Sequence, residues 1–179
     1  MPIARTRSMT AFVGLLRAVN VGGTGKLPMS ELIKLSAAAG FNRVQTYIAS
    51  GNVVFASDMD EASVKHALEG KLADYADRPV GVAVRTADEM AAVLAANPFA
   101  GSRPDRTVAI FLDNPPPADA LDHVRGRTSE AIALGVREIY VAYGEAMGRS
   151  RLSIPAAKAG TARNMNTVAK LGKMAAELV

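Results

Sequence analysis

The spacing of apolar residues in the first half of the chain predicts four strands separated by helices. Apolar or β-branched runs of strand length occupy residues 12–19, 44–48, 53–55 and 80–84. Apolar positions recur at helical spacing between and after them, beginning near residues 28, 64 and 86. Short runs of the first kind are typical of strands, and the second spacing is typical of helices with one buried face. The expected order is therefore strand, helix, strand, strand, helix, strand, helix.

Residues with special backbone preferences mark the ends of these elements. Pro28 stands at a first helical position, and Gly40 follows the predicted helix as a stop signal. The Ser50–Asn52 segment separates two strand-like runs and predicts a hairpin turn. Thr86 and Glu89 have the spacing of a capping box, which predicts the start of a short helix.

The second half predicts the same order at its beginning. The best candidate linker is Gly101-Ser102-Arg103-Pro104. It is followed by a strand over 108–112, a Pro115–Pro117 break, a helix from about Ala118, and a hairpin through 132–134 and 138–143. Helical sequence fills the remainder, with an amphipathic helix from Arg163 onward and Thr161 as its candidate cap. The order of elements recurs, but no convincing residue-level repeat is visible.

These elements predict an α+β fold made of two similar subdomains. A β-α-β-β-α-β order is typical of a ferredoxin-like, split βαβ antiparallel sheet with its helices packed on one face. The expected parts are an extension over 1–8, a first subdomain over 9–100, a linker over 101–106, and a second subdomain over 107–179 with a basic C-terminal helix. In this topology the third strand inserts between the first two. The loop over 20–26 and the hairpin over 50–52 should therefore lie at the same end of the first sheet.

The composition is that of a globular protein. Hydrophobic residues make up 49% and charged residues 21% of the 179 positions, which argues against disorder. Cysteine is absent, and this excludes disulfides, thiolate zinc sites and cysteine nucleophiles together. No segment has the apolar length of a membrane span, and the run after Arg7 is too short for a signal sequence. We expect a soluble, cytoplasmic protein with no membrane partner, for which Met9 is an alternative start.

Positive charge is concentrated near the C-terminus. The net charge is +4, and residues 147–176 contain basic residues but no acidic one. The basic residues of this region are Arg149, Arg151, Lys158, Arg163, Lys170 and Lys173. Arg163 and Asn164 stand at the predicted helix start. A cation such as Arg163 is unfavourable there unless an anion lies close to it. The competing interpretation is an ordinary solvated helix face.

A glycine-rich segment joins the first predicted strand to the first helix. It has the context of a phosphate-binding loop, but Asn20 and Leu27 stand where the Walker motif needs Gly and Ser or Thr. A weaker hypothesis is that backbone N–H groups of Gly22 and Gly23 bind an anion beside Lys26. The alternative is that the glycines only provide a tight or flexible connection.

The predicted hairpin supplies a second group of polar side chains, namely Tyr47, Ser50 and Asn52. Turn formation alone would explain their types. The complete candidate ligand-binding set is Arg17, Asn20, Gly22, Gly23, Lys26, Tyr47, Ser50, Asn52, Arg149, Arg151, Arg163 and Asn164. No catalytic residue, metal site or cofactor is predicted, because His66 and His123 lie off the apolar faces of their predicted helices and no cluster has metal-ligand spacing.

Several of these segments also resemble a known family. Residues 15–23, 46–55, 97–99, 148–152 and 161–167 are similar to motifs of a bacterial family catalogued as domain of unknown function 1697. The resemblance implies a two-subdomain fold built from ferredoxin-like units, and it supplies no reaction, substrate or catalytic residue. The family usually has Gly where this chain has Ala18, Trp where it has Met165, and often Lys where it has Arg151.

Four functional hypotheses remain open at this point. The first is binding of a small anionic or nucleotide-like ligand near the first β-α loop and the seam between subdomains, where Gly22 and Gly23 would meet Arg149, Arg151 and Arg163. The second is a nucleic-acid-associated module that uses the basic C-terminal region, although no aromatic stacking surface is evident. The third is an enzyme acting on a phosphorylated or carboxylated metabolite. The fourth is an interaction protein without a ligand.

Overall fold

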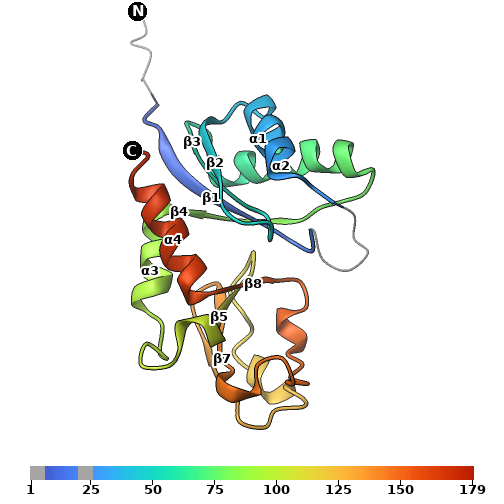
Figure 1. Cartoon of the computed structure of the whole chain (residues 1–179), viewed down its shortest axis with the longest axis vertical. Coiled ribbons are helices and arrows are strands. Elements are labelled where there is room, and N and C mark those ends of the chain that lie inside the picture. Colours follow the sequence, from blue (N-terminus) through green and yellow to red (C-terminus); the bar gives the residue numbers. More distant parts are fainter. Residues whose placement is uncertain (1–6, 20–25) are drawn as a thin grey trace, which may run out of the picture. The chain divides into compact units, whose positions relative to one another are not determined.

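The computed structural model describes residues 7–19 and 26–179. Within these residues the chain forms two four-stranded antiparallel sheets and four α-helices, so the α+β prediction is confirmed (Figure 1). The chain divides into two compact units, one containing the residues up to Ala87 together with Lys173–Val179, and the other Asp88–Gly172. The second unit thus begins earlier in the chain than the linker expected at 101–106. Among the described helices, none combines the length and apolarity needed to cross a bilayer.

The first sheet has the strand order β2-β3-β1-β4. Its strands are β1 (Thr10–Leu16), β2 (Asn42–Thr46), β3 (Asn52–Ser57) and β4 (Val82–Thr86). Strand β3 pairs antiparallel with both β1 and β2, so it lies between them and makes them parallel to one another. The turn between β2 and β3 lies at the end of β1, because the Leu16 amide donates to the Gly51 carbonyl at 2.9 Å. This is the insertion expected from the order of elements.

Two helices cover one face of this sheet, α1 (Met29–Ala38) and α2 (Glu61–Ala76) (Figure 1). Alternate residues of the strands face them and form an apolar core. At its centre the ring of Phe55 stacks on Phe41, with centroids 4.0 Å apart, and on Phe12 at 5.8 Å. Burial of these rings gives the first unit a large part of its stability, because aromatic side chains bury the most apolar area per residue.

Both edges of the first sheet are modified in ways that hinder pairing with another strand. On β4, the Val82 amide donates to the Glu69 carboxylate at 2.9 Å, and the Val82 carbonyl accepts from Lys65. Lys65 and Glu69 also form an ion pair along α2. On β2, the register shifts between Asn42 and Gln45, which is a bulge that bends the strand. Such devices protect exposed strand edges.

The second sheet repeats the strand order of the first, as β6-β7-β5-β8. Its strands are β5 (Thr107–Phe111), β6 (Ala131–Leu134), β7 (Glu138–Ala142) and β8 (Thr161–Asn164). Helices α3 (Ala87–Ala95) and α4 (Met165–Ala176) follow β4 and β8, respectively. The Tyr140 hydroxyl of β7 donates to the Val93 carbonyl of α3 at 2.7 Å, and burial raises the pKa of this phenol to about 12. The chain connections within the sheet contain only short 3-10 helices: Ala120–His123, Gly144–Ala146 and Pro155–Ala157.

Two predictions for the second half are wrong. The helix expected from Ala118 is reduced to the 3-10 turn Ala120–His123, because Pro117 precedes it and Gly126, with φ of +69°, ends the available length. So short a segment cannot offset the cost of helix nucleation. The helix expected from Arg163 begins only at Met165, and Thr161–Asn164 form β8 instead.

The cap of α4 is therefore Asn164 rather than Thr161. The Asn164 side-chain oxygen accepts from the Thr167 amide at 2.9 Å, which satisfies one donor of the first helical turn. Pairing with β5 decides the structure of the residues before it, because Arg163 lies opposite Ala109 in the sheet. Tertiary pairing here overrides the local helical pattern.

The structure also shows a residue-level repeat that the sequence did not reveal. Arg85 pairs with Val13 on the central strand of the first sheet, and Arg163 pairs with Ala109 on the central strand of the second. Each arginine stands two residues before a helix and is almost fully buried. Each also donates from Nη1 to the carbonyl of the preceding residue at 2.9 Å.

Candidate functional site

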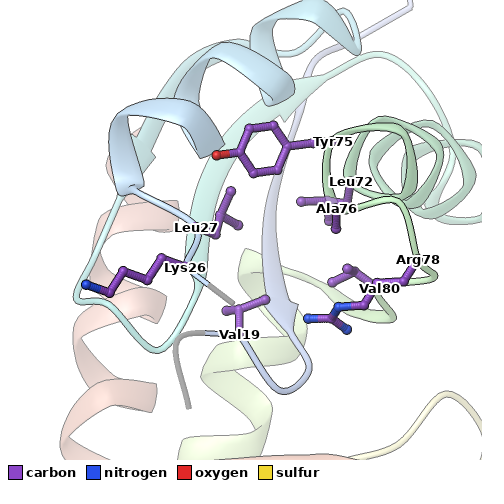
Figure 2. Close-up of a pocket in the computed structure, with 8 residues that line it drawn as sticks. All are labelled: Val19, Lys26, Leu27, Leu72, Tyr75, Ala76, Arg78 and Val80. Carbon is purple, nitrogen blue, oxygen red and sulfur yellow. The ribbon is translucent and has the colours of Figure 1, made fainter. Parts of the chain in front are cut away.

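A pocket of about 280 Å³ opens in the first unit, where the segment after β1 meets the end of α2 (Figure 2). Three separate segments of the chain form it: the segment after β1, the residues just before α1, and the end of α2 with the residues that follow. The described residues that line it are Val19, Lys26, Leu27, Leu72, Tyr75, Ala76, Arg78 and Val80. The volume is at the lower end of the range of small-molecule sites.

The floor of the pocket is apolar and is held by the core of the first unit. Val19, Leu27, Leu72 and Val80 line the pocket and are at the same time buried members of the core beneath α1 and α2. Ala76 completes this surface from the last turn of α2. Because these side chains are packed from behind, the floor is preformed rather than assembled by a ligand.

The rim is polar and positively charged. It carries the ammonium group of Lys26, the guanidinium group of Arg78 and the phenol of Tyr75, all on exposed residues. In Figure 2 the Arg78 guanidinium extends toward Val19, whereas the Lys26 side chain leads outward from the pocket. The Arg78 cation beside an apolar floor, with the Lys26 cation at the outer edge, favours a ligand that combines an anionic group with an apolar portion.

Local sequence signals place these rim residues. Helix α2 ends at Ala76 because Asp77 adopts the left-handed conformation, with φ of +54°, and Arg78 follows directly. Pro28 precedes α1 with φ of −60°, which sets Lys26 and Leu27 just ahead of the helix. A cation after a helix C-terminus is also favourable to the helix itself, so Arg78 has a structural role besides any ligand contact.

The glycine-rich loop predicted as part of the site is only partly described. Asn20, Gly22 and Gly23 lie outside the described residues, so the predicted role of their backbone in anion binding stays a prediction. Lys26, from the same loop, lines the pocket. Arg17 is half-buried at the end of β1, where its backbone amide donates to the Gly81 carbonyl at 2.9 Å.

The polar residues of the predicted hairpin organise its turn. Asn52 is fully buried, and its side-chain amide donates to the Tyr47 carbonyl at 2.8 Å and to the Ser50 hydroxyl at 2.9 Å. Gly51 adopts φ of +88°, which a glycine tolerates without strain. These contacts give Asn52 and Ser50 a structural role, and direct ligand contact by the hairpin stays a prediction.

The late basic motif does not form one exposed surface. Arg163 is buried in β8, where its guanidinium donates to the Thr161 hydroxyl at 2.7 Å, and burial lowers its pKa to about 10. Arg149 and Arg151 are exposed, and Asn164 caps α4. The predicted seam site depends on Gly22 and Gly23, which are not among the described residues, and it stays a prediction.

The serine of the same motif is tied to a buried carboxylate. The Ser150 hydroxyl donates to Glu130 at 2.7 Å, and the Thr128 amide donates to the same carboxylate at 2.6 Å. These hydrogen bonds, that of Ser150 first, lower the pKa of Glu130. The Gly148–Leu152 motif therefore pins a loop of the second unit to the segment before β6.

Sequence reasoning missed most of the pocket. The helical spacing that begins near residue 64 continues to Tyr75 and so predicts it on the apolar face of the helix, and no predicted motif includes Arg78. The Asp77-Arg78-Pro79 helix end was the available signal for Arg78, but nothing in the chain spacing places it near Lys26. In residues 7–19 and 26–179, no group of His, Asp and Glu side chains is arranged to hold a metal ion.

Comparisons with known proteins find a matching family model and a similar solved structure. A family model described as "Protein of unknown function (DUF1697)" matches residues 9–140. A solved structure, the conserved bacterial protein SP0830 from Streptococcus pneumoniae, is similar at 25% sequence identity with a TM-score of 0.77. The similarity covers 93% of this chain and 99% of the other. No match was found among curated proteins.

Proposed function

Since the chain belongs to the DUF1697 family, whose description assigns no activity, we propose a function from the pocket itself. The first unit binds a small ligand that joins an anionic group, such as a phosphate, to an apolar or aromatic portion. A nucleotide-like compound is the narrower form of this proposal. The proposal concerns binding and includes no reaction.

The observation that carries the proposal is the pairing of an apolar floor with a cationic rim. Arg78 can donate two parallel N–H groups to an oxyanion, and Lys26 adds a second positive charge. The Tyr75 hydroxyl can donate or accept a hydrogen bond and so orient a ligand. The floor from Val19 to Val80 would bury the apolar portion.

The strand order of the first unit supports the narrower fold assignment that accompanies this proposal. Strand β3 lies between β1 and β2, and α1 and α2 cover one face. We keep the ferredoxin-like assignment for this unit as part of the proposal. In that arrangement the pocket lies at the sheet end where β1 finishes, beside Val19 and Lys26.

Thermal-shift measurements test the proposal. Phenyl phosphate, phenol and inorganic phosphate are compared first, followed by nucleoside monophosphates and other phosphorylated metabolites. A ligand that binds only the folded protein raises Tm in proportion to the logarithm of its concentration above Kd. We expect phenyl phosphate to raise Tm more than either of its parts, because only the ester uses both the rim and the floor.

A charge-matched pair of variants locates the binding. Lys26→Gln combined with Arg78→Gln should weaken phenyl phosphate binding by at least about tenfold, since a hydrogen bond to a charged group is worth about 1.5–3 kcal/mol. Lys170→Gln combined with Lys173→Gln removes the same charge from exposed positions on α4 and should leave binding unchanged. The proposal fails when no compound raises Tm, or when both double variants weaken binding equally.

A further inference from the structure

The turn between β2 and β3 touches the wall of the pocket. A Cβ atom added to Gly51 would lie 2.5 Å from Val19 Cγ2 and 2.9 Å from Leu16 Cβ, both closer than real side chains approach. Val19 is in turn a lining residue of the pocket. The isopropyl group of Val19 therefore stands between the turn and the pocket, in contact with a glycine backbone that no larger residue could replace without movement.

This turn is longer than its hairpin requires. In the first sheet the Tyr47 amide donates to the Asn52 carbonyl, which leaves residues 48–51 in the turn. In the second sheet the Gly135 amide donates to the Glu138 carbonyl, which leaves only residues 136 and 137. The two hairpins are otherwise in the same register, because Leu16 donates to Gly51 and Leu112 donates to Arg137, both at 2.9 Å.

The longer turn is also held in a costly conformation. Ile48 adopts φ of +51°, a left-handed conformation that is unfavourable for a β-branched residue, and the residue is 49% exposed. Strain of this kind persists only where the surroundings enforce it. Here the buried amide of Asn52 holds the turn through its bonds to Tyr47 and Ser50.

We propose that this turn, residues 47–52, sets the ligand specificity of the pocket, with Gly51 as a positioning residue that acts through Val19. The inference rests on the proposed function of the pocket. Val19 forms one side of the apolar part of the pocket. Its position therefore limits the size of the ligand's apolar portion that fits beside Lys26 and Arg78. Movement of Val19 by the turn changes that limit without altering the charges that hold the anion.

The test compares two glycines with similar positive φ angles. Gly51 and Gly40 have φ of +88° and +94°, but a Cβ at Gly40 would meet nothing within 4 Å. Gly51→Ala and Gly40→Ala therefore both introduce left-handed strain and should both lower Tm. Only Gly51→Ala also displaces Val19.

The measured quantity is the ratio of Kd values for 1-naphthyl phosphate and phenyl phosphate, which share the anion and differ in apolar size. Gly51→Ala should change this ratio by roughly tenfold, the usual effect of a small steric change in an apolar site. Gly40→Ala should leave it at the wild-type value. Adding Val19→Ala to Gly51→Ala removes the closer of the two clashing groups, the Val19 methyl group, and should move the ratio back toward that of the wild type.

Val19→Ala alone leaves Gly51 in place and introduces no left-handed strain, so it tests the wall even when Gly51→Ala fails to fold. It should favour the naphthyl compound relative to the wild type. A ratio that stays the same in Gly51→Ala and in Val19→Ala overturns this inference while the proposed function stands. Failure of the wild-type protein to bind either phosphate overturns both.

Discussion

The two units share the strand order and register of their sheets and differ in what joins the strands. Equivalent backbone bonds join the central strand of each sheet to the neighbouring hairpin turn, from Leu16 to Gly51 and from Leu112 to Arg137, and Arg85 and Arg163 occupy equivalent register positions. In the first unit two long helices connect the strands and cover one face. In the second unit short 3-10 helices and loops make the same connections. The register of such a sheet is therefore independent of how its crossovers are built.

The two units also differ in how one face of each sheet is stabilised. In the first unit the covering layer is apolar and centres on stacked Phe41, Phe55 and Phe12. In the second unit the smaller apolar core is supplemented by polar contacts that hold loops in place, of which Ser150 with Glu130 is the clearest. The first unit should respond most to loss of volume, and the second to loss of hydrogen bonds and to pH.

The largest expected effect comes from truncating the stacked core. Phe55→Ala removes a fully buried ring and should lower the free energy of unfolding of the first unit by about 3–5 kcal/mol. Val141 occupies the equivalent register position in the second sheet and is equally buried, and Val141→Ala should cost about 2 kcal/mol. Urea unfolding with hydrogen exchange resolved by residue measures both. Equal losses would contradict the difference between the two cores.

A smaller, pH-dependent effect is expected in the second unit. The pKa of Glu130 is below its ordinary value of 4.5 in the folded protein, chiefly because Ser150 donates to it. The carboxylate therefore adds stability above the ordinary pKa, and this stability is lost as pH falls through the lowered value. Ser150→Ala should lower Tm at neutral pH and bring the variant and the wild type together in acid.

Ser102→Ala is the matched control for this change, since Ser102 is exposed. It should leave Tm close to the wild-type value at every pH. An NMR titration of Glu130 provides the direct measurement, with an upward shift of its pKa expected in Ser150→Ala. A Tm difference between Ser150→Ala and the wild type that is independent of pH would show that the serine acts by packing alone.

The smallest effect concerns the point where the central strand leaves the first sheet. Ala18 has φ of +48°, so Ala18→Gly should relieve left-handed strain and raise stability by up to about 1 kcal/mol. Ala39, with φ of −74°, is the control, and Ala39→Gly should lower stability by about 0.5–1 kcal/mol. Thermal unfolding of both variants gives the sign. A loss of stability in Ala18→Gly would mean that the Ala18 methyl group contributes packing that outweighs the strain.

The sequence predicted the parts of the fold that local chemistry decides. The stop at Gly40 and the turn at Gly51 are confirmed by their positive φ values, and the apolar stripe beginning at Val64 is confirmed as the buried face of α2. Each of these depends on residues close together in the chain. The same approach failed for Thr161–Asn164, because their pairing with β5 lies more than forty residues away in sequence.

Only one residue of the candidate site, Lys26, was predicted, because the other polar lining residues come from a part of the chain that is distant in sequence. Lys26 was identified from a glycine-rich loop, but Tyr75 and Arg78 come from the far end of α2. Tyr75 and Arg78 lie near Lys26 only because of how α2 packs on the sheet, and the spacing of residues along the chain does not specify that packing. The close contact of Gly51 with Val19 is likewise a property of the folded sheet. From the sequence alone, the turn is a sufficient explanation for a glycine at this position.

The contacts of Lys65 and Glu69 with Val82 have a consequence for behaviour at high concentration. An exposed strand edge can nucleate growth of intermolecular sheet, and growth by addition requires an amide and a carbonyl that accept a new neighbour. At Val82 both groups are bonded to α2, so an incoming strand would have to break two charge-assisted bonds before it gained any. The helix that covers the core thus also acts as a gatekeeper against self-assembly of β4.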